Sequence, residues 1–139
     1  MYNYQTSVKL HDTDMAGFLF FGHQFKIAHD AYEEFMEAVG LGFARLIHNA
    51  EFLLPIVHAE ADYKTVLQVG DKLKVQVQAV NIGKTSFTLG YNLVGIDGES
   101  VGTVKTVHVC VDSARREKMP LPEKLRKALL SITDKSKTK

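Results

Sequence analysis

Residues 12–35 read DTDMAGFLFFGHQFKIAHDAYEEF, a short polar loop followed by the beginning of a long amphipathic segment. Over residues 24–39, apolar side chains recur at helical spacing and charged side chains occupy the opposite face. The apolar side chains of this segment are Phe25, Ala28, Tyr32, Phe35, Met36 and Val39. Gly40 suits the position just after a helix end. The sequence therefore predicts one long helix with one buried face.

Most of the remaining chain alternates apolar and polar residues, which is typical of strands with one buried face. The pattern predicts strands over residues 4–10, 52–63, 71–82, 85–94 and 99–111, and a short closing helix over 122–130. Asp97-Gly98 is a two-residue hairpin turn, so the last strand returns beside the one before it. These elements indicate an α+β fold in which a curved antiparallel β-sheet wraps around the one long helix.

Pro55 interrupts the strand expected over residues 52–63. Because proline cannot donate a hydrogen bond to a neighbouring strand, it marks a sheet edge or a bulge. By simple alternation, His58 on this strand shares one face with Ile56, Glu60 and Asp62. A lone histidine in such a place is more often structural than functional. An exposed edge also invites pairing with a second chain.

The composition suits one globular domain, which we assign to residues 1–132, followed by a basic, flexible tail at 133–139. Of the 139 residues, 45% are hydrophobic, which is enough to form a core. The net charge of +1 argues against general attraction to nucleic acid or an anionic membrane, and no apolar run reaches membrane-spanning length. Cys110 is the only cysteine, so no intramolecular disulfide forms and we expect a reducing cytoplasm.

Charge is distributed unevenly along the chain. Residues 11–62 hold nine acids and two bases, whereas residues 113–139 hold nine bases and three acids. The C-terminal third therefore offers a local anion site. A cluster such as Arg115, Arg116 and Lys118 is usually a solvated turn, but it also has the chemistry that binds phosphate groups. His11 beside Asp12 has no second group of ligands at metal-binding spacing, so we expect no metal.

The polar loop before the long helix carries Asp12, Asp14 and Gly17. The free amides of the first helical turn, over residues 21–24, point into the same space and can hold an oxygen on which negative charge develops. A carboxylate beside such donors can attack an acyl carbon or activate a water, a combination that suits acyl transfer. The alternative is that either aspartate only caps the helix or the turn.

This stretch resembles the active-site segment of the 4-hydroxybenzoyl-CoA thioesterase branch of the hotdog fold, whose pattern is Asp-x-Asp-x-x-Gly, apolar residues and then the central helix. Three further segments resemble the subfamily that hydrolyses 1,4-dihydroxy-2-naphthoyl-CoA on the way to phylloquinone or menaquinone. They read LPIVHAEADYKTVLQVGDKLKV, TVHVCVD and KMPLP. The likeness runs over residues 4–130. It implies hydrolysis of an aromatic acyl-CoA, with CoA as part of the substrate and no separate cofactor.

The resemblance also implies roles for single residues. The second aspartate of the family motif falls on Asp14, which becomes the nucleophile or general base. The amide that polarises the thioester carbonyl falls on Phe21 or Gly22, although this pair departs from the aromatic-then-Pro/Asn pattern common in the family. Gly17 fits the close turn between them. A thioester has a good leaving group, so one carboxylate and one or two N–H donors suffice without a Ser-His-Asp triad.

Candidates for substrate binding lie farther along the chain. By the resemblance, Lys84 and Ser86 are candidates for contacts with CoA, as is the basic cluster at 115–118. His58 is a candidate for lining the acyl pocket at a subunit interface. The family likeness further implies a homodimer with a sheet continued across the interface and active sites built from both chains, commonly doubled to a homotetramer.

Two classes of function remain open at this point. One is an acyl-CoA thioesterase, either for 1,4-dihydroxy-2-naphthoyl-CoA or with broad specificity for short-chain or aromatic acyl groups. The other is a non-catalytic hotdog module that binds acyl ligands, with Asp14 serving only as a cap. A dehydratase of the same fold is a third option, but no histidine-rich hydratase motif surrounds the helix.

Overall fold

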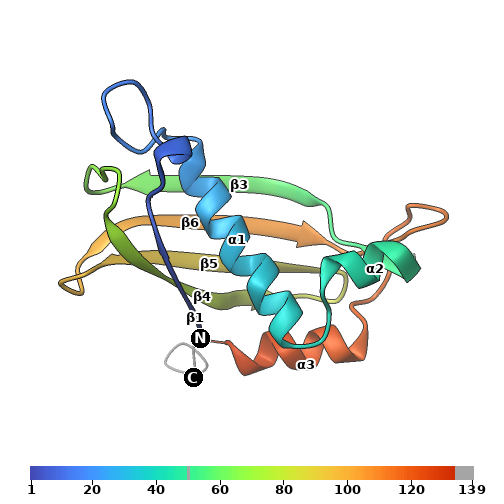
Figure 1. The fold of residues 1–139 in the computed structure, drawn as a ribbon. Helices are drawn as coiled ribbons and strands as arrows, with labels where there is room; N and C mark the ends of the chain where they lie inside the picture. The colour runs from blue at the N-terminus through green and yellow to red at the C-terminus, as the bar shows by residue number, and fades with distance from the viewer. Residues whose placement is uncertain (50, 134–139) are drawn as a thin grey trace.

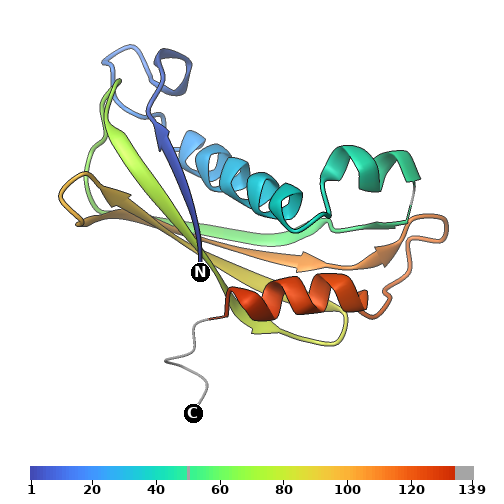
Figure 2. The same cartoon turned by 60° about the horizontal axis from the view of Figure 1, so that its bottom comes forward.

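In a computed structural model that describes residues 1–49 and 51–133, a five-stranded antiparallel sheet curves around helix α1 (Figures 1 and 2). The strand order is β1-β4-β5-β6-β3. The strands are β1 (Tyr2–Ser7), β3 (Ile56–Tyr63), β4 (Lys72–Ile82), β5 (Ser86–Gly95) and β6 (Ser100–Val109). Helix α1 covers His23–Ala38. The predicted α+β architecture, with a curved antiparallel sheet around one long helix, is confirmed.

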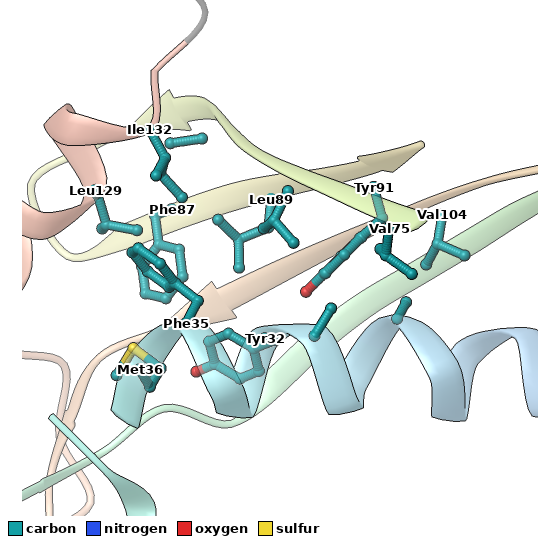
Figure 3. Close-up of a cluster of buried hydrophobic side chains, with 14 of the residues drawn as sticks. Tyr32, Phe35, Met36, Val75, Phe87, Leu89, Tyr91, Val104, Leu129 and Ile132 are labelled. Atoms are coloured by element: carbon teal, nitrogen blue, oxygen red, sulfur yellow. The ribbon is translucent and has the colours of Figure 1, made fainter. Parts of the chain in front are cut away.

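The core lies between α1 and the concave face of the sheet. Along β4 and β5 the buried residues alternate with partly exposed ones, as expected for strands with one covered face. Figure 3 shows Tyr32, Phe35 and Met36 of α1 directed toward the sheet, where Phe87 and Leu89 meet them. Each fully buried side chain of this size stabilises the fold by about 1.5–3 kcal/mol. The apolar face of the helix and the apolar faces of the strands therefore form one core.

Both ends of α1 are set by the local sequence. The helix begins at His23, one residue before the predicted start, and ends at Ala38. Gly40 follows with φ of +79°, a left-handed conformation that costs a side-chain-bearing residue free energy. The chain then forms a second helix, α2 (Phe43–Asn49), which the sequence analysis did not predict. It is only seven residues long, too short to show a clear helical period.

The first strand differs from its prediction over 4–10. It begins at Tyr2 and ends at Ser7, and a single 3₁₀ turn, η1 (Leu10–Asp12), follows. The side chain of Asp12 accepts a hydrogen bond from the Lys9 amide at 3.0 Å, which turns the chain away from the sheet. The closing helix α3 (Glu123–Ser131) lies one residue after its predicted position, and Thr133 bridges to Ala79 of β4. Residues 134–139 of the expected tail lie outside the described residues.

Pro55 divides the strand predicted over 52–63 into two. The first piece, β2 (Phe52–Leu53), pairs with β7 (Val111–Asp112) in a separate two-stranded sheet. The second piece, β3, is an edge strand of the main sheet and is exposed along nearly its whole length. The expectation that proline marks an edge or bulge is confirmed.

A register shift between Ile56 and His58 also changes which side chains share a face of β3. Ile56 pairs with buried His108 and lies on the side of α1. His58 pairs with Val107, and its ring hydrogen-bonds Glu60 on the outer face. The prediction that Ile56 and His58 share a face was wrong. The bulge adds one residue to β3, so side chains before it point to the opposite face from the one that simple alternation gives.

Candidate active site

The loop that leads from η1 into α1 is folded as a small hairpin. Thr13 and Leu19 form an antiparallel bridge, and the Asp14 amide donates to the Phe18 carbonyl at 2.8 Å. Gly17 makes the turn possible with φ of +83°. The Phe20 amide donates to the Asp12 carbonyl at 3.0 Å, which closes the base of the hairpin. Asp14 therefore lies near the tip of a hydrogen-bonded structure and not in a loose loop.

The hairpin is anchored to the rest of the protein by backbone hydrogen bonds to the segment that precedes β4. The Leu19 amide donates to the Leu67 carbonyl at 2.8 Å, and the Val69 amide donates to the Gly17 carbonyl at 3.1 Å. Two segments that are about fifty residues apart in sequence thus lie side by side near the start of α1 (Figure 1). This anchoring fixes the position of Asp14 relative to the helix.

The Asp14 side chain is exposed, and its own loop orients it. One carboxylate oxygen, Oδ1, accepts hydrogen bonds from the amides of Ala16 at 2.9 Å and Phe18 at 3.2 Å. Within the part of the chain that the structure describes, Oδ2 has no hydrogen-bond partner. The loop contacts fit the capping alternative, but they also leave one oriented oxygen open to a ligand or a water.

Two backbone amides at the start of α1 are free of protein acceptors. The His23 amide donates to the Phe20 carbonyl at 2.9 Å, and the Gln24 amide donates to the Phe21 carbonyl at 3.3 Å. The amides of Phe21 and Gly22 have no acceptor among residues 1–49 and 51–133. They also lie at the positive end of the helix dipole, so they can bind an oxygen that gains negative charge.

A pocket of about 200 Å³ lies beside Phe21, between the start of α1 and the segment that follows β3. Tyr63 borders it, and its hydroxyl donates to the Phe21 carbonyl at 2.7 Å. Buried Gln24 donates to the Asp62 carbonyl at 3.0 Å and to the Thr103 carbonyl at 3.1 Å, which ties α1 to the sheet. The sequence analysis missed both Tyr63 and Gln24. The only available signal was a polar glutamine among the apolar positions of the helix.

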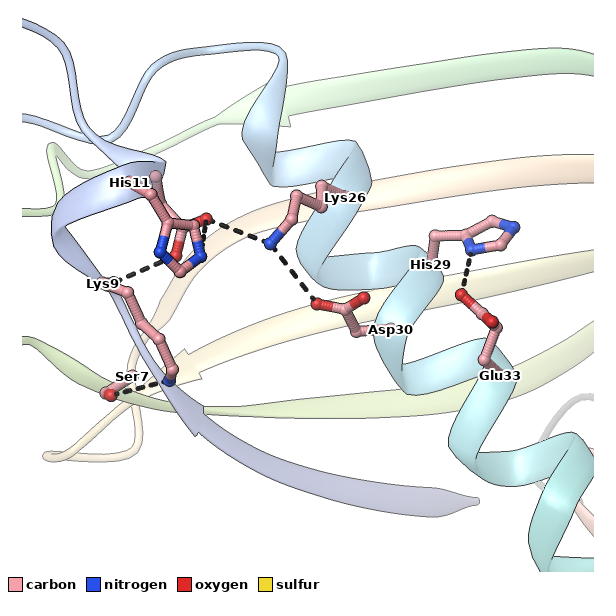
Figure 4. Close-up of polar contacts among 8 residues, drawn as sticks. Ser7, Lys9, His11, Lys26, His29, Asp30 and Glu33 are labelled. Atoms are coloured by element: carbon pink, nitrogen blue, oxygen red, sulfur yellow. Dashed lines mark hydrogen bonds and ion pairs between the residues drawn. The ribbon is translucent and has the colours of Figure 1, made fainter.

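Asp12, the first aspartate of the motif, is buried, and its hydrogen bonds are made within the protein. Its carboxylate accepts hydrogen bonds from the Lys9 amide and from Lys26 Nζ at 3.2 Å. Figure 4 shows Lys26 reaching from α1 toward this loop, with Asp30 on its other side. Burial alone would raise the pKa of Asp12, but the Lys9 amide and the hydrogen bond and charge of Lys26 outweigh it and hold that pKa below its usual value. The structure thus separates the two aspartates, since Asp12 is paired internally and Asp14 faces outward.

This pairing predicts how acid affects stability. Because the folded-state pKa of Asp12 is below its unfolded value, the stabilisation is fully present above about pH 4 and is lost as the pH falls further. We expect Asp12→Asn to lower the free energy of unfolding by about 1–3 kcal/mol at pH 7 and to reduce its decline in acid. Urea unfolding from pH 3 to pH 7 measures both effects.

Asp30→Asn provides the control for the Asp12 prediction. Its carboxylate is partly exposed and lies 3.9 Å from the same Lys26 Nζ, so the free energy of unfolding should change by less than about 0.5 kcal/mol. Equal losses in the two variants would contradict a special role for Asp12.

The residues predicted to bind CoA lie at the opposite end of the molecule from Asp14. Arg115, Arg116 and Lys118 are exposed on the loop after β7, which Figure 1 shows far from the start of α1. The Leu121 amide donates to the Lys84 carbonyl at 2.9 Å, which joins this region to the β4–β5 hairpin. Within one chain the basic residues and Asp14 do not form a common site.

The same end holds one predicted polar residue and one that the sequence analysis missed. Ser86 is half-buried at the start of β5, where its carbonyl accepts from the Gly83 amide at 2.8 Å. Arg126 of α3 donates through Nη2 to the Gly83 carbonyl at 2.9 Å. The sequence does not predict this contact, because Arg126 and Gly83 are 43 positions apart. Arg126 Nη2 also lies 3.4 Å from the Lys84 carbonyl, so it adds a basic side chain to this hairpin.

His58 belongs neither to the Asp14 loop nor to the group of basic residues at the other end of the molecule. It is exposed on the outer face of β3, and its Nε2 is 3.0 Å from Glu60 Oε1. Among the described residues, no three histidine, cysteine, aspartate or glutamate side chains are grouped as a metal site would require. His11 Nε2 lies 3.7 Å from the Asp12 carboxylate, which is already paired with Lys26. Over the same residues, no helix is long and apolar enough to cross a membrane.

Comparison with known proteins adds a family and several relatives. The family model described as the thioesterase-like superfamily matches residues 8–129. The chain is 35% identical over 134 residues to a 1,4-dihydroxy-2-naphthoyl-CoA hydrolase of Synechococcus elongatus, an alignment that covers 96% of this chain and 98% of the relative. The family match includes the Asp14 loop, the long helix and the whole of the sheet from β3 onward.

Solved structures show the same similarity in three dimensions. A 1,4-dihydroxy-2-naphthoyl-CoA thioesterase from Synechocystis superimposes with a TM-score of 0.88 at 29% identity, covering 94% of this chain and 96% of that one. A gentisyl-coenzyme A thioesterase superimposes with a TM-score of 0.81 at 25% identity, covering 92% of this chain and 98% of that one. The acyl groups named for both structures are hydroxylated aromatic rings.

Proposed function

Because the chain belongs to the thioesterase-like superfamily, we propose that it hydrolyses the thioester of an aromatic acyl-CoA, namely 1,4-dihydroxy-2-naphthoyl-CoA, to 1,4-dihydroxy-2-naphthoate and CoA. The observation that carries this proposal is that one loop before α1 holds an oriented, exposed Asp14 carboxylate and, within nine residues of it, two free amides. The reaction serves the synthesis of phylloquinone or menaquinone, in which this acid is an intermediate. A broad-specificity aromatic or short-chain acyl-CoA thioesterase is the alternative.

The chemistry follows from these groups. The thioester carbonyl oxygen accepts a hydrogen bond from the amide of Phe21 or Gly22, which stabilises the negative charge that forms on it. Asp14 then attacks the carbonyl carbon, or removes a proton from a water that attacks it. The C–S bond breaks and CoA leaves as a thiolate, which takes up a proton. If Asp14 is the nucleophile, water hydrolyses the resulting acyl-aspartyl anhydride in a second step.

A hydrolysis screen over aroyl- and fatty acyl-CoAs tests the substrate class. We expect the highest kcat/KM with 1,4-dihydroxy-2-naphthoyl-CoA and slower turnover of benzoyl and short-chain thioesters. Similar values across the panel would favour the broad-specificity enzyme. Turnover no faster than the uncatalysed thioester would contradict both and leave an acyl-binding module.

We propose that the active unit is at least a homodimer formed through β3, which is exposed along the sheet edge. Antiparallel pairing of two β3 strands about their middle would place the Ile56 end of one chain beside the Tyr63 end of the other. Tyr63 contacts Phe21, whereas the Ile56 end lies near β7 and the basic loop. A partner's basic loop would thereby approach the Asp14 end.

Sedimentation at micromolar concentration is expected to show a dimer or a tetramer. Introducing Ala59→Lys at the middle of β3 should weaken the assembly, because two like charges would meet across the strand pair. Asn3→Lys adds the same charge to an exposed position of β1, the opposite edge strand of the sheet, and should leave the mass unchanged. A wild-type monomer would contradict the proposed interface.

The basic loop is proposed to bind the CoA phosphates. Phosphates far from the reacting carbon are bound about equally in the ground and transition states, so their loss raises KM more than it lowers kcat. We therefore expect the triple variant Arg115→Ala, Arg116→Ala and Lys118→Ala to raise KM for acyl-CoA by about tenfold, with kcat nearly unchanged. Steady-state kinetics at low ionic strength measures this. An unchanged KM would exclude the loop and leave Lys84, Ser86 and Arg126 as the next candidates.

A further inference from the structure

A second pocket lies between α1 and β3, farther along the helix than the Asp14 loop. Its volume is about 300 Å³. Phe25 and His29 border it from the helix, and Ile56 and Ala59 border it from the edge strand. Tyr91 of β5 and Thr106 of β6 border it from the sheet. None of the residues proposed for the hydrolytic step lines this pocket.

A buried chain of polar side chains lies at the sheet side of the pocket. The Tyr91 hydroxyl is 3.0 Å from Thr106 Oγ1, and Thr106 Oγ1 is 2.8 Å from His108 Nε2. All three residues are less than one-tenth exposed, and Figure 3 shows the Tyr91 hydroxyl directed toward α1. Tyr91 and Thr106 both border the pocket. Burying three polar groups costs free energy, which their hydrogen bonds to one another offset only in part, and none of the three takes part in the proposed hydrolytic step.

The chain leaves one hydrogen-bonding function of Tyr91 unused. Burial lowers the pKa of His108 to about 4, so at pH 7 the ring is neutral and has one donor and one acceptor nitrogen. If Nε2 of His108 accepts from Thr106, Thr106 accepts from Tyr91; if Nε2 donates to Thr106, Thr106 donates to Tyr91. Among the described residues the Tyr91 hydroxyl bonds only Thr106, so either its proton or its lone pairs stay free. A ligand hydroxyl, which both donates and accepts, matches both cases.

The pocket lies at a suitable distance from the free amides at the helix start. Phe25 and His29 are four residues apart in α1 and share one face of the helix, and Phe21 lies two residues before the helix begins. Phe25, which borders the pocket, is three residues after the N-cap Gly22, or about 5 Å along the helix axis. That length is comparable with an aromatic ring, so a ring attached to a carbonyl at Phe21 or Gly22 extends into the pocket.

We propose that this pocket binds the aromatic ring of the acyl group and that the Tyr91 hydroxyl, held by Thr106 and His108, hydrogen-bonds a ring hydroxyl remote from the thioester. The inference rests on the proposed function, because it concerns the acyl group of that substrate. It makes Tyr91 a specificity-determining residue. An acyl group without the hydroxyl leaves the buried Tyr91 function unpaired and is therefore selected against.

The test compares two substrates that differ in one atom group. 1-Hydroxy-2-naphthoyl-CoA lacks only the 4-hydroxyl of 1,4-dihydroxy-2-naphthoyl-CoA. We expect the wild type to prefer the dihydroxy substrate by about 10- to 100-fold in kcat/KM. In Tyr91→Phe this preference should fall to within about twofold, because only the dihydroxy substrate loses a partner. Measuring both substrates on one preparation makes the ratio independent of how much enzyme is folded.

Variants at Thr106 and Thr103 complete the design. Thr106→Val should lower the preference and Thr106→Ser should restore it, since serine keeps the hydroxyl that holds Tyr91. Thr103→Val makes the same change three residues earlier on the outer face of β6, facing Asp62, and should leave the preference unchanged. Thermal unfolding of each variant confirms that the protein is folded.

The outcomes separate this inference from the proposed function. Turnover of both naphthoyl thioesters with a wild-type preference near one, or with a preference that Tyr91→Phe does not change, would overturn the role of Tyr91 and leave the thioesterase function intact. Turnover of neither would overturn the proposed function, and this inference with it.

Discussion

Replacing Asp14 by asparagine is expected to lower kcat by about 10²- to 10⁴-fold while the protein still folds and binds acyl-CoA. The asparagine oxygen can accept the same hydrogen bonds from Ala16 and Phe18, so the hairpin keeps its shape. What the variant loses is the negative charge and the basicity of the outward carboxylate oxygen. Single-turnover hydrolysis, with enzyme in excess, measures the chemical step directly.

Asp12→Asn is the matched control for this experiment, because it changes the other aspartate of the same motif. Its carboxylate is buried against Lys9 and Lys26, so the variant should lose stability but keep most of its activity per folded molecule. If Asp14 were only a cap, Asp14→Asn would also keep most of its activity per folded molecule. A fully active Asp14→Asn would exclude the proposed mechanism.

The second large effect concerns the backbone at the start of α1. Replacing the peptide nitrogen of Phe21 or Gly22 by an ester oxygen removes one N–H and leaves the side chain in place. Neither amide donates to a described acceptor, so neither change removes a hydrogen bond that the fold makes through that N–H. The ester also weakens the preceding carbonyl as an acceptor, which for the Gly22 ester is the Phe21 carbonyl bound by Tyr63 and Gln24, so the free energy of unfolding should fall by about 1 kcal/mol. If that amide polarises the thioester carbonyl, kcat should fall by about 10²- to 10³-fold.

Comparing the two ester variants identifies which amide acts. We expect a large fall in kcat for at least one of them, with KM changed much less, because the hydrogen bond strengthens as charge develops on the oxygen. An ester at His23 would be a poor control, since its amide already bonds the Phe20 carbonyl. Full activity in both the Phe21 and Gly22 esters would show that the helix start does not stabilise the transition state.

The long elements of the fold could be predicted from the sequence because burial of one face imposes a period on it. The period of 3.6 in α1 and the period of two in β4 and β5 are visible in any window of ten residues or more. The short elements gave no such signal. Helix α2 and the turn η1 span seven and three residues, and the first strand was misplaced because Asp12 bonds the Lys9 amide and ends it early.

The candidate site was predictable where its parts are close in sequence. Asp14, Gly17 and the amides of Phe21 and Gly22 lie within nine residues, so their order alone places them in one loop before one helix. The contacts that support this loop join distant residues, such as Tyr63 with Phe21 and Gln24 with the Asp62 carbonyl. No spacing in the sequence predicts such pairs, because they depend on how the helix and the strands pack against each other.

The sequence by itself determined the fold class, the long helix, the edge strand at Pro55 and the loop that presents Asp14. Only the tertiary structure decided that Asp12 faces inward and Asp14 outward, and that the basic loop lies at the opposite end of the molecule from Asp14. It also decided that Tyr91, Thr106 and His108 form one buried series of hydrogen bonds. The physical reason is that periodicity and turn chemistry act between near neighbours, whereas side-chain meetings depend on register. A single extra residue at the bulge after Ile56 moved that side chain to the opposite face from His58.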